Sequence, residues 1–236
     1  GKVDLFLDAW LPDTHVDYMK KYGDRLETIG IPFENARLGL AVPSYVTINT
    51  IEELNANKER FKGEIIGIDI GASLMNLTED AVNDYGLQLK LMPSSGPTMT
   101  AFLQKSVEHN DWIVVTGWTP HWMFARYDLK FLDDDKGVYG DTEHIAAVAT
   151  KGFSETHPFV AAFFRNFRFT NEQLSELMNI MEDYPLRELE GAKVWLKKHP
   201  EIVDLFLPSQ ANNLTQLNGY ETDRENSLPA AGTGNQ

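Results

Sequence analysis

The sequence predicts an α/β fold of two lobes with mostly parallel sheets, joined so that they can close like a clamp. First, apolar segments with strand character alternate with helical segments through the middle of the chain, an order typical of parallel sheets. Second, residues 46–141 form one such α/β lobe, while the flanks, residues 1–45 and 142–207, would join to make the other. The chain then crosses between the lobes twice, which describes a hinged clamp.

The first lobe opens with two predicted strands and a short helix. Residues 3–9 alternate apolar and polar side chains, as in a half-buried strand, and residues 14–22 follow as a helix. Residues 37–42 form the second strand, which Pro43 ends because proline cannot donate to a strand ladder.

The middle lobe contains three predicted strands and three predicted helices. Thr50 and Glu53 have the spacing of a capping box, so a helix is expected from there to about residue 61. The segment 64–70 is apolar and β-branched, as in a buried parallel strand. It ends in a Gly-Ala-Ser turn that starts the next helix. The following elements are a helix at 74–85, a strand at 88–92, a helix at 98–108 and a strand at 112–116.

The chain returns to the first lobe through a polar, turn-rich segment at residues 130–141. Residues 144–150 then form a strand, and four helices follow. These are expected to start near Thr156, at the Thr170–Gln173 capping pair, near Leu186 and near Glu201. Residues 208–236 are polar and without periodicity, so we expect a disordered tail or linker there.

Composition argues against several functional classes. The formal net charge of −14 repels nucleic acid, so no nucleic-acid partner is expected. The absence of cysteine rules out disulfides, thiol nucleophiles and thiolate metal sites. No metalloprotease, phosphate-loop or nucleophile-elbow motif occurs, and the histidines lack metal-ligand spacing. We therefore predict no catalytic residues, no metal site and no cofactor.

Two tryptophan motifs are the strongest functional signals. Residues 117–122 read Gly-Trp-Thr-Pro-His-Trp and directly follow a predicted buried strand, so Trp118 is expected on a loop. Ligands of open parallel sheets bind at this end of the strands. Trp10 lies at the end of the first predicted strand, in the other lobe. The alternative is that Trp118 and Trp122 only fill a lobe interface, whereas Trp112 and Trp195 have the pattern of core residues.

The chemistry of two facing indoles suits a quaternary ammonium ion. Such a cation has no N–H group, so hydrogen bonds cannot hold it, but each desolvated indole face can contribute up to about 2 kcal/mol. The turn before Ser73 and Leu74 starts a helix, where free backbone N–H groups favour an anion. His15 can add another donor. A ligand with both a quaternary nitrogen and a carboxylate would use all five positions.

At these motifs the chain resembles the glycine betaine/proline betaine substrate-binding proteins of ABC importers, the OpuAC/ProX-like family. The resemblance covers residues 1–207, and the matching stretches are residues 8–15, 38–43, 66–69 with Gly71, and 116–124. It implies a type II periplasmic-binding-protein clamp. It also implies an aromatic box in which Trp10 and Trp118 are walls, and a carboxylate held by His15 and by the backbone N–H groups at Ser73 and Leu74.

In the first lobe this sequence differs from the family that it resembles. Family members have a further tryptophan after an earlier strand in the lobe of the Ala-Trp-Leu-Pro motif. That strand, its helix and a second strand–helix region should precede Gly1, and they are not in this sequence. The first lobe is therefore expected to be incomplete, without its third aromatic wall.

The resulting expectation is a binding protein and not an enzyme. It would capture glycine betaine, proline betaine, carnitine or a related quaternary ammonium osmolyte for the transmembrane subunits of an ABC permease. It would lie at the extracellular face of the cell membrane, as a lipoprotein or permease-fused domain, or in the periplasm. Contact with the membrane would come only from an anchor or fused permease outside this sequence. The alternatives are a ligand-sensing domain on the same fold, or an enzyme acting on a small cationic substrate.

Overall fold

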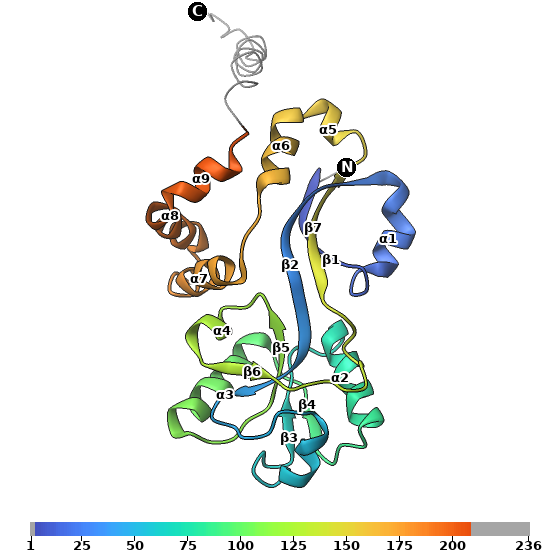
Figure 1. Cartoon of the computed structure of the whole chain (residues 1–236), viewed down its shortest axis with the longest axis vertical. Helices are drawn as coiled ribbons and strands as arrows, with labels where there is room; N and C mark the ends of the chain where they lie inside the picture. Colours follow the sequence, from blue (N-terminus) through green and yellow to red (C-terminus); the bar gives the residue numbers. More distant parts are fainter. Residues whose placement is uncertain (1–2, 209–236) are drawn as a thin grey trace, which may run out of the picture.

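The computed structural model describes residues 3–208 (Figure 1). Residues 1–2 and 209–236 lie outside the described residues, so the predicted tail is described only at its first residue. One strand, β2 (Leu26–Pro43), is 18 residues long and runs from the upper to the lower half of the molecule in Figure 1. The described strands form one seven-stranded sheet system in which β2 takes part in both halves.

The upper half is built on an antiparallel sheet. Strand β1 (Leu5–Leu11) pairs with β7 (Glu143–Thr150), and β7 pairs with the first part of β2. Two short helices, α1 (Val16–Tyr22) and the 3₁₀ helix η1 (Gly23–Arg25), connect β1 to β2. Segments that are remote in the sequence thus share one sheet, since 99 residues separate β2 from β7.

The lower half is built on a mixed sheet. The last part of β2 pairs antiparallel with β5 (Val115–Thr119) and with β6 (Leu129–Phe131). Strand β3 (Glu64–Ile66) lies parallel to β5 on one side and to β4 (Lys90–Met92) on the other. Helices α2 (Ser73–Asp84) and α3 (Gly96–His109) follow β3 and β4, and α4 (Met123–Arg126) follows β5.

The prediction of mostly parallel sheets is wrong, although the α/β class is confirmed. Of the six strand pairings, four are antiparallel and two are parallel. The difference arises in β2, because its first eleven residues were not predicted as strand. Those residues and the end of β2 pair with β5, β6 and β7, which are remote in sequence, and hydrophobic periodicity carries no information about such partners.

The α-helix predicted from the capping pair at residues 50 and 53 is also wrong. The segment forms only a short 3₁₀ helix, η2 (Glu52–Asn57). The Glu53 carboxylate accepts from the backbone N–H groups of Asn49 and Thr50, which is half of a capping box. The Thr50 hydroxyl lies 3.4 Å from the same carboxylate and leaves the amide of residue 53 without its side-chain cap.

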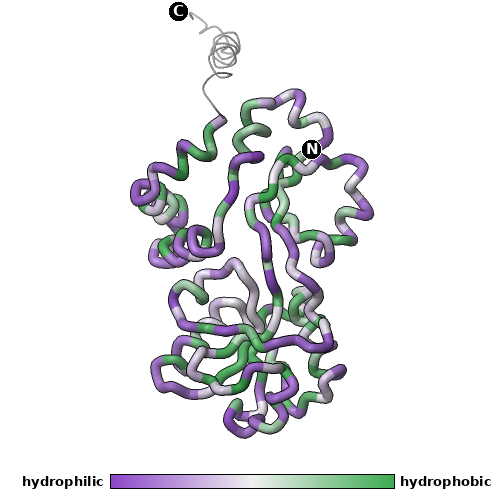
Figure 2. Tube along the Cα trace, viewed as in Figure 1, coloured by the Kyte–Doolittle hydropathy of each residue, from purple (hydrophilic) through white to green (hydrophobic). Residues whose placement is uncertain are grey.

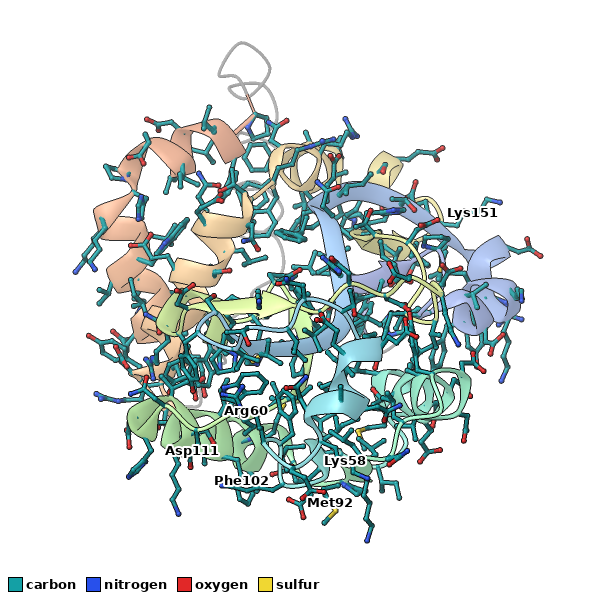
Figure 3. All side chains as sticks on the ribbon, turned by 60° about the horizontal axis from the view of Figure 1, so that its bottom comes forward. Lys58, Arg60, Met92, Phe102, Asp111 and Lys151 are labelled. Carbon is teal, nitrogen blue, oxygen red and sulfur yellow. The ribbon has the colours of Figure 1, made fainter. Side chains whose placement is uncertain are left out.

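The core of the lower half fills the space between its sheet and helices. Figure 2 shows apolar residues gathered in the middle of this half and polar residues on the helices around it. Trp112 is 9% exposed and belongs to this core as predicted, although it lies before β5 and not within it. The Arg60 guanidinium lies 3.2 Å from the centroid of the Trp112 indole ring. Figure 3 labels Arg60 in this half, well apart from Lys151 in the other half.

The C-terminal third is helical, as predicted. It contains α5 (Phe153–Thr156), α6 (Pro158–Asn166), α7 (Asn171–Glu182), α8 (Glu188–Lys198) and α9 (Pro200–Phe206). The predicted capping box at the start of α7 is present, with Thr170 and Gln173 exchanging both hydrogen bonds. Helix α6 lies so close to β2 that a Cβ atom on Gly30 would be 2.1 Å from the Phe164 carbonyl oxygen. Trp195 is buried between α7, α8 and α9, in the core as predicted.

We propose that the two halves act as lobes with the boundaries expected from sequence, residues 1–45 with 142–207 and residues 46–141. Strand β2 makes one crossing, and the segment between β6 and β7 makes the other. Within residues 3–208, every helix is too short or too polar to cross a bilayer.

Candidate ligand-binding site

A cavity of about 790 Å³ lies between residues of the two sheets and α7. All five site residues predicted from sequence line it: Trp10, His15, Ser73, Leu74 and Trp118. Trp10 comes from β1 in the upper sheet, and Trp118 comes from β5 in the lower sheet. The two tryptophan motifs, which are 108 positions apart in the sequence, therefore meet at one cavity.

Trp10 is half-buried and its polar groups are occupied. The indole Nε1–H donates to Asp8 Oδ1 at 2.8 Å, and the backbone N–H donates to His15 Nδ1 at 2.9 Å. These two bonds restrict the position of the ring at the end of β1. Since the indole N–H is already bonded, the ring is left with its π faces as the means of contacting a ligand.

His15 lines the cavity with one of its two ring nitrogens already bonded. Its Nδ1 accepts from Trp10 N–H, so in the neutral ring the proton is on Nε2. The backbone N–H of His15 donates in turn to the Trp10 carbonyl oxygen at 3.0 Å. The reciprocal pair closes residues 10–15 into a turn that fixes the imidazole relative to the indole.

Trp118 lies within β5, so the prediction that it lies on a loop is wrong. Strand β5 extends to Thr119 because it continues to pair with β2, with Trp118 opposite Leu38. The indole is half-buried and its ring centroid is 4.4 Å from that of His121, in a T-shaped arrangement. A strand holds the ring more rigidly than a loop would.

His121 supports Trp118 as a neutral ring. It is 8% exposed, and burial lowers its pKa from 6.5 to about 4. Its Nδ1 accepts from the Met123 backbone N–H at 3.2 Å. At neutral pH no imidazolium therefore stands next to Trp118 to oppose a bound cation.

This pKa predicts a pH dependence of stability. As the pH falls from 6.5 toward 4, the unfolded chain takes up a proton at His121 before the folded chain does, so stability is lost over that window. Compared with His121→Asn, which keeps an acceptor for Met123, the wild-type free energy of unfolding should fall by up to about 3 kcal/mol more between pH 7 and pH 4. Urea unfolding of both proteins at several pH values measures this, and parallel curves would contradict it.

Ser73 and Leu74 lie at the start of α2. The Leu74 side chain is buried in the core, whereas Ser73 is exposed. Neither backbone N–H has an acceptor within residues 3–208, and no side chain caps this helix end. Two unpaired amides at a helix start can bind a carboxylate.

Sequence reasoning missed the wall that α7 contributes. Four apolar side chains of this helix line the cavity, and three phenylalanine rings line it as well: Leu174, Leu177, Met178, Met181, Phe33, Phe167 and Phe169. The helix residues are spaced i, i+3, i+4 and i+7, which is one face of an α-helix. The spacing was visible in the sequence, but it did not indicate what that face contacts.

Arg126 connects this wall to the lower half. It lies at the end of α4, and its guanidinium donates to Asn179 Oδ1 at 2.8 Å and to Asp183 Oδ1 at 2.8 Å. It also lies 5.0 Å from the centroid of the Trp122 ring. Helix α7 is thus held against the half of the molecule that contains Trp118.

The chain matches a family model over residues 1–198, described as the substrate binding domain of ABC-type glycine betaine transport system (OpuAC). It is 45% identical over 148 residues to the glycine betaine/carnitine transport binding protein GbuC of Listeria monocytogenes. That match covers 61% of this chain and 49% of the relative. The chain thus spans about half the length of the curated relative.

Two solved structures are similar across most of the chain. The glycine betaine/L-proline-binding protein ProX of Borrelia burgdorferi is 35% identical with a TM-score of 0.75, covering 89% of this chain and 80% of that one. The lactococcal OpuAC, in its closed conformation complexed with glycine betaine, is 36% identical with a TM-score of 0.72. It covers 88% of this chain and 81% of that one.

These similarities confirm the periplasmic-binding-protein-like α/β fold, and the relatives are substrate-binding proteins of ABC importers rather than enzymes. Substrate-binding proteins of ABC importers work outside the cytoplasm. Because the family model matches well over half of the sequence, the assignment rests on the whole pattern and not on the tryptophan motifs alone. The chain belongs to the family of substrate-binding domains of ABC-type glycine betaine transport systems.

Proposed function

We propose that this protein captures glycine betaine, or a related betaine such as proline betaine or carnitine, for uptake by an ABC importer. The observation that carries the proposal is the meeting of Trp10 and Trp118, from different sheets, at one cavity that also contains two unpaired helix-start amides. The relatives' ligands support it, since GbuC is a glycine betaine/carnitine protein and OpuAC was solved with glycine betaine.

In this proposal the indole faces hold the quaternary nitrogen. Its methyl groups offer no hydrogen-bond donor, and the ring quadrupole of each tryptophan attracts the cation. The phenylalanine rings and the apolar face of α7 surround the same cavity and exclude water, which strengthens the attraction. The neutral state of His121 keeps a competing positive charge away from Trp118.

The carboxylate end of the ligand is bound by donors. The N–H groups of Ser73 and Leu74 lie at the positive end of the α2 helix, and His15 offers its Nε2–H. Hydrogen bonds to a charged acceptor are worth about 1.5–3 kcal/mol each. This set of donors favours a betaine over choline, whose hydroxyl group carries no charge.

Isothermal titration of the protein with glycine betaine and with choline tests the proposal. We expect glycine betaine to bind at least about 10-fold more tightly, because choline forfeits at least one charge-assisted bond. Equal affinities would contradict the assignment of the carboxylate donors. The absence of heat and of any tryptophan fluorescence change with all betaines tried would contradict the proposed function itself.

The partner in this proposal is the transmembrane permease of the importer, to which the loaded clamp delivers its ligand. The site of action would be the extracellular face of the membrane, through a lipid anchor or fusion to the permease, or the periplasm. The acidic character of the chain, with a net charge of −14, makes direct adsorption to anionic lipid unfavourable.

A further inference from the structure

Glu143 is a buried carboxylate outside the ligand cavity. It is the first residue of β7, at the point where the chain returns from the lower half, and it pairs with Ala36 of β2. Only 6% of its surface is exposed. It lines a neighbouring cavity of about 430 Å³, which shares Thr14, Leu38 and Ser73 with the cavity of the two tryptophans, but Glu143 does not line the latter.

The carboxylate binds the turn that connects Trp10 to His15. Glu143 Oε1 accepts from the backbone N–H of Asp13 at 2.9 Å and from that of Thr14 at 2.7 Å. The donors are about 130 positions away in the sequence. Both distances are in the range of well-formed N–H···O hydrogen bonds.

The outer residues of the turn depend on this contact for their position, whereas Trp10 and Leu11 are also paired with β7. Its base is closed by the reciprocal bonds between Trp10 and His15, and within residues 3–208 the N–H groups of Asp13 and Thr14 both donate to Glu143. Removing the carboxylate would leave two amides without an acceptor. A freed turn would displace the imidazole of His15, which lies beyond the end of β1, while the strand keeps Trp10 paired with Ile145.

We propose that Glu143 is a positioning residue for the betaine site: it holds the turn at residues 10–15 so that His15 faces the ligand cavity beside Trp10. This inference rests on the proposed function for its effect on affinity. Glu143 acts through the turn and contacts no ligand. Its second oxygen, Oε2, is buried and has no partner among the described residues, so one oxygen alone performs the tethering.

Three variants test the proposal by titration with glycine betaine and by thermal unfolding. Glu143→Ala should weaken binding by at least about 10-fold, whereas Glu143→Gln, whose amide oxygen can still accept, should recover most of the affinity. Glu27→Ala is the matched control, because Glu27 Oε1 likewise accepts a remote backbone N–H, that of Ser154 at 2.8 Å. Glu27→Ala should lower thermal stability and leave affinity within about twofold.

Equal losses of affinity in Glu143→Ala and Glu27→Ala would overturn the proposal, because they would show a general effect of stability. Full affinity in Glu143→Ala, or no recovery in Glu143→Gln, would overturn it as well. Amide hydrogen exchange of the ligand-free protein tests the tether separately. The amides of Asp13 and Thr14 should exchange at least about 10-fold faster in Glu143→Ala, while those in the middle of β7 keep their rates. If the wild-type protein bound no betaine, the proposed function would fail, and this exchange result would still decide whether Glu143 holds the turn.

Discussion

Replacing Trp118 with alanine is expected to weaken glycine betaine binding by about 1–3 kcal/mol. The indole lines the ligand cavity from β5 and is held in a strand, so its face is already oriented before the ligand arrives. Alanine removes the cation–π attraction and opens space to water beside the quaternary nitrogen. Isothermal titration of wild type and variant measures the difference directly.

Two further variants make this result specific. Trp118→Phe keeps an aromatic face and should retain part of the affinity that alanine loses. Trp112→Phe changes a tryptophan that is buried in the core and does not line the cavity, so affinity should stay within about twofold. Unchanged affinity in Trp118→Ala would show that this indole has only a structural role and does not contribute to ligand binding.

Replacing Trp195 with alanine should destabilise the fold by about 3–5 kcal/mol. The indole is 1% exposed, packs against Phe169 and donates its Nε1–H to Glu176 at 3.1 Å. It links α7 to α8, so its removal leaves a large void under the helix that forms the apolar wall of the site. Urea unfolding at constant pH gives the change in free energy.

Leu189→Ala is the control for this second variant. Leu189 lies on the same helix, α8, but is 67% exposed, so its truncation should change stability by no more than about 0.5 kcal/mol. A small effect of Trp195→Ala, comparable to that of Leu189→Ala, would show that the C-terminal helices contribute little to the stability of the fold.

The candidate site was predictable because its residues follow strands or start helices. Trp10 lies near the end of β1, His15 directly precedes α1, and Ser73 and Leu74 begin α2, close to the positions expected from local sequence. Such positions converge in space for topological reasons. The motif containing Trp118 pointed to the same place, although the strand continued through it.

What could not be predicted depends on partners that are remote in the sequence. Whether the strands pair parallel or antiparallel depends on which strands lie next to β2. Those strands, β5, β6 and β7, begin 72 or more positions after the end of β2. The apolar face of α7 was recognisable, but nothing local says that it covers the ligand cavity. The bonds from Arg126 to α7 and from Glu143 to the turn at residues 10–15 likewise join segments that only the folded chain brings together.

The shared strand has a consequence for how the molecule can be divided. Each half needs β2 to satisfy the backbone groups of its neighbours, β7 in one half and β5 in the other. A fragment that contains one half together with β2 removes that strand from the other half. The other half is then left with an open sheet edge, which is prone to association. The two halves are therefore not interchangeable modules, and any chimera with a relative has to exchange β2 together with the partners it serves.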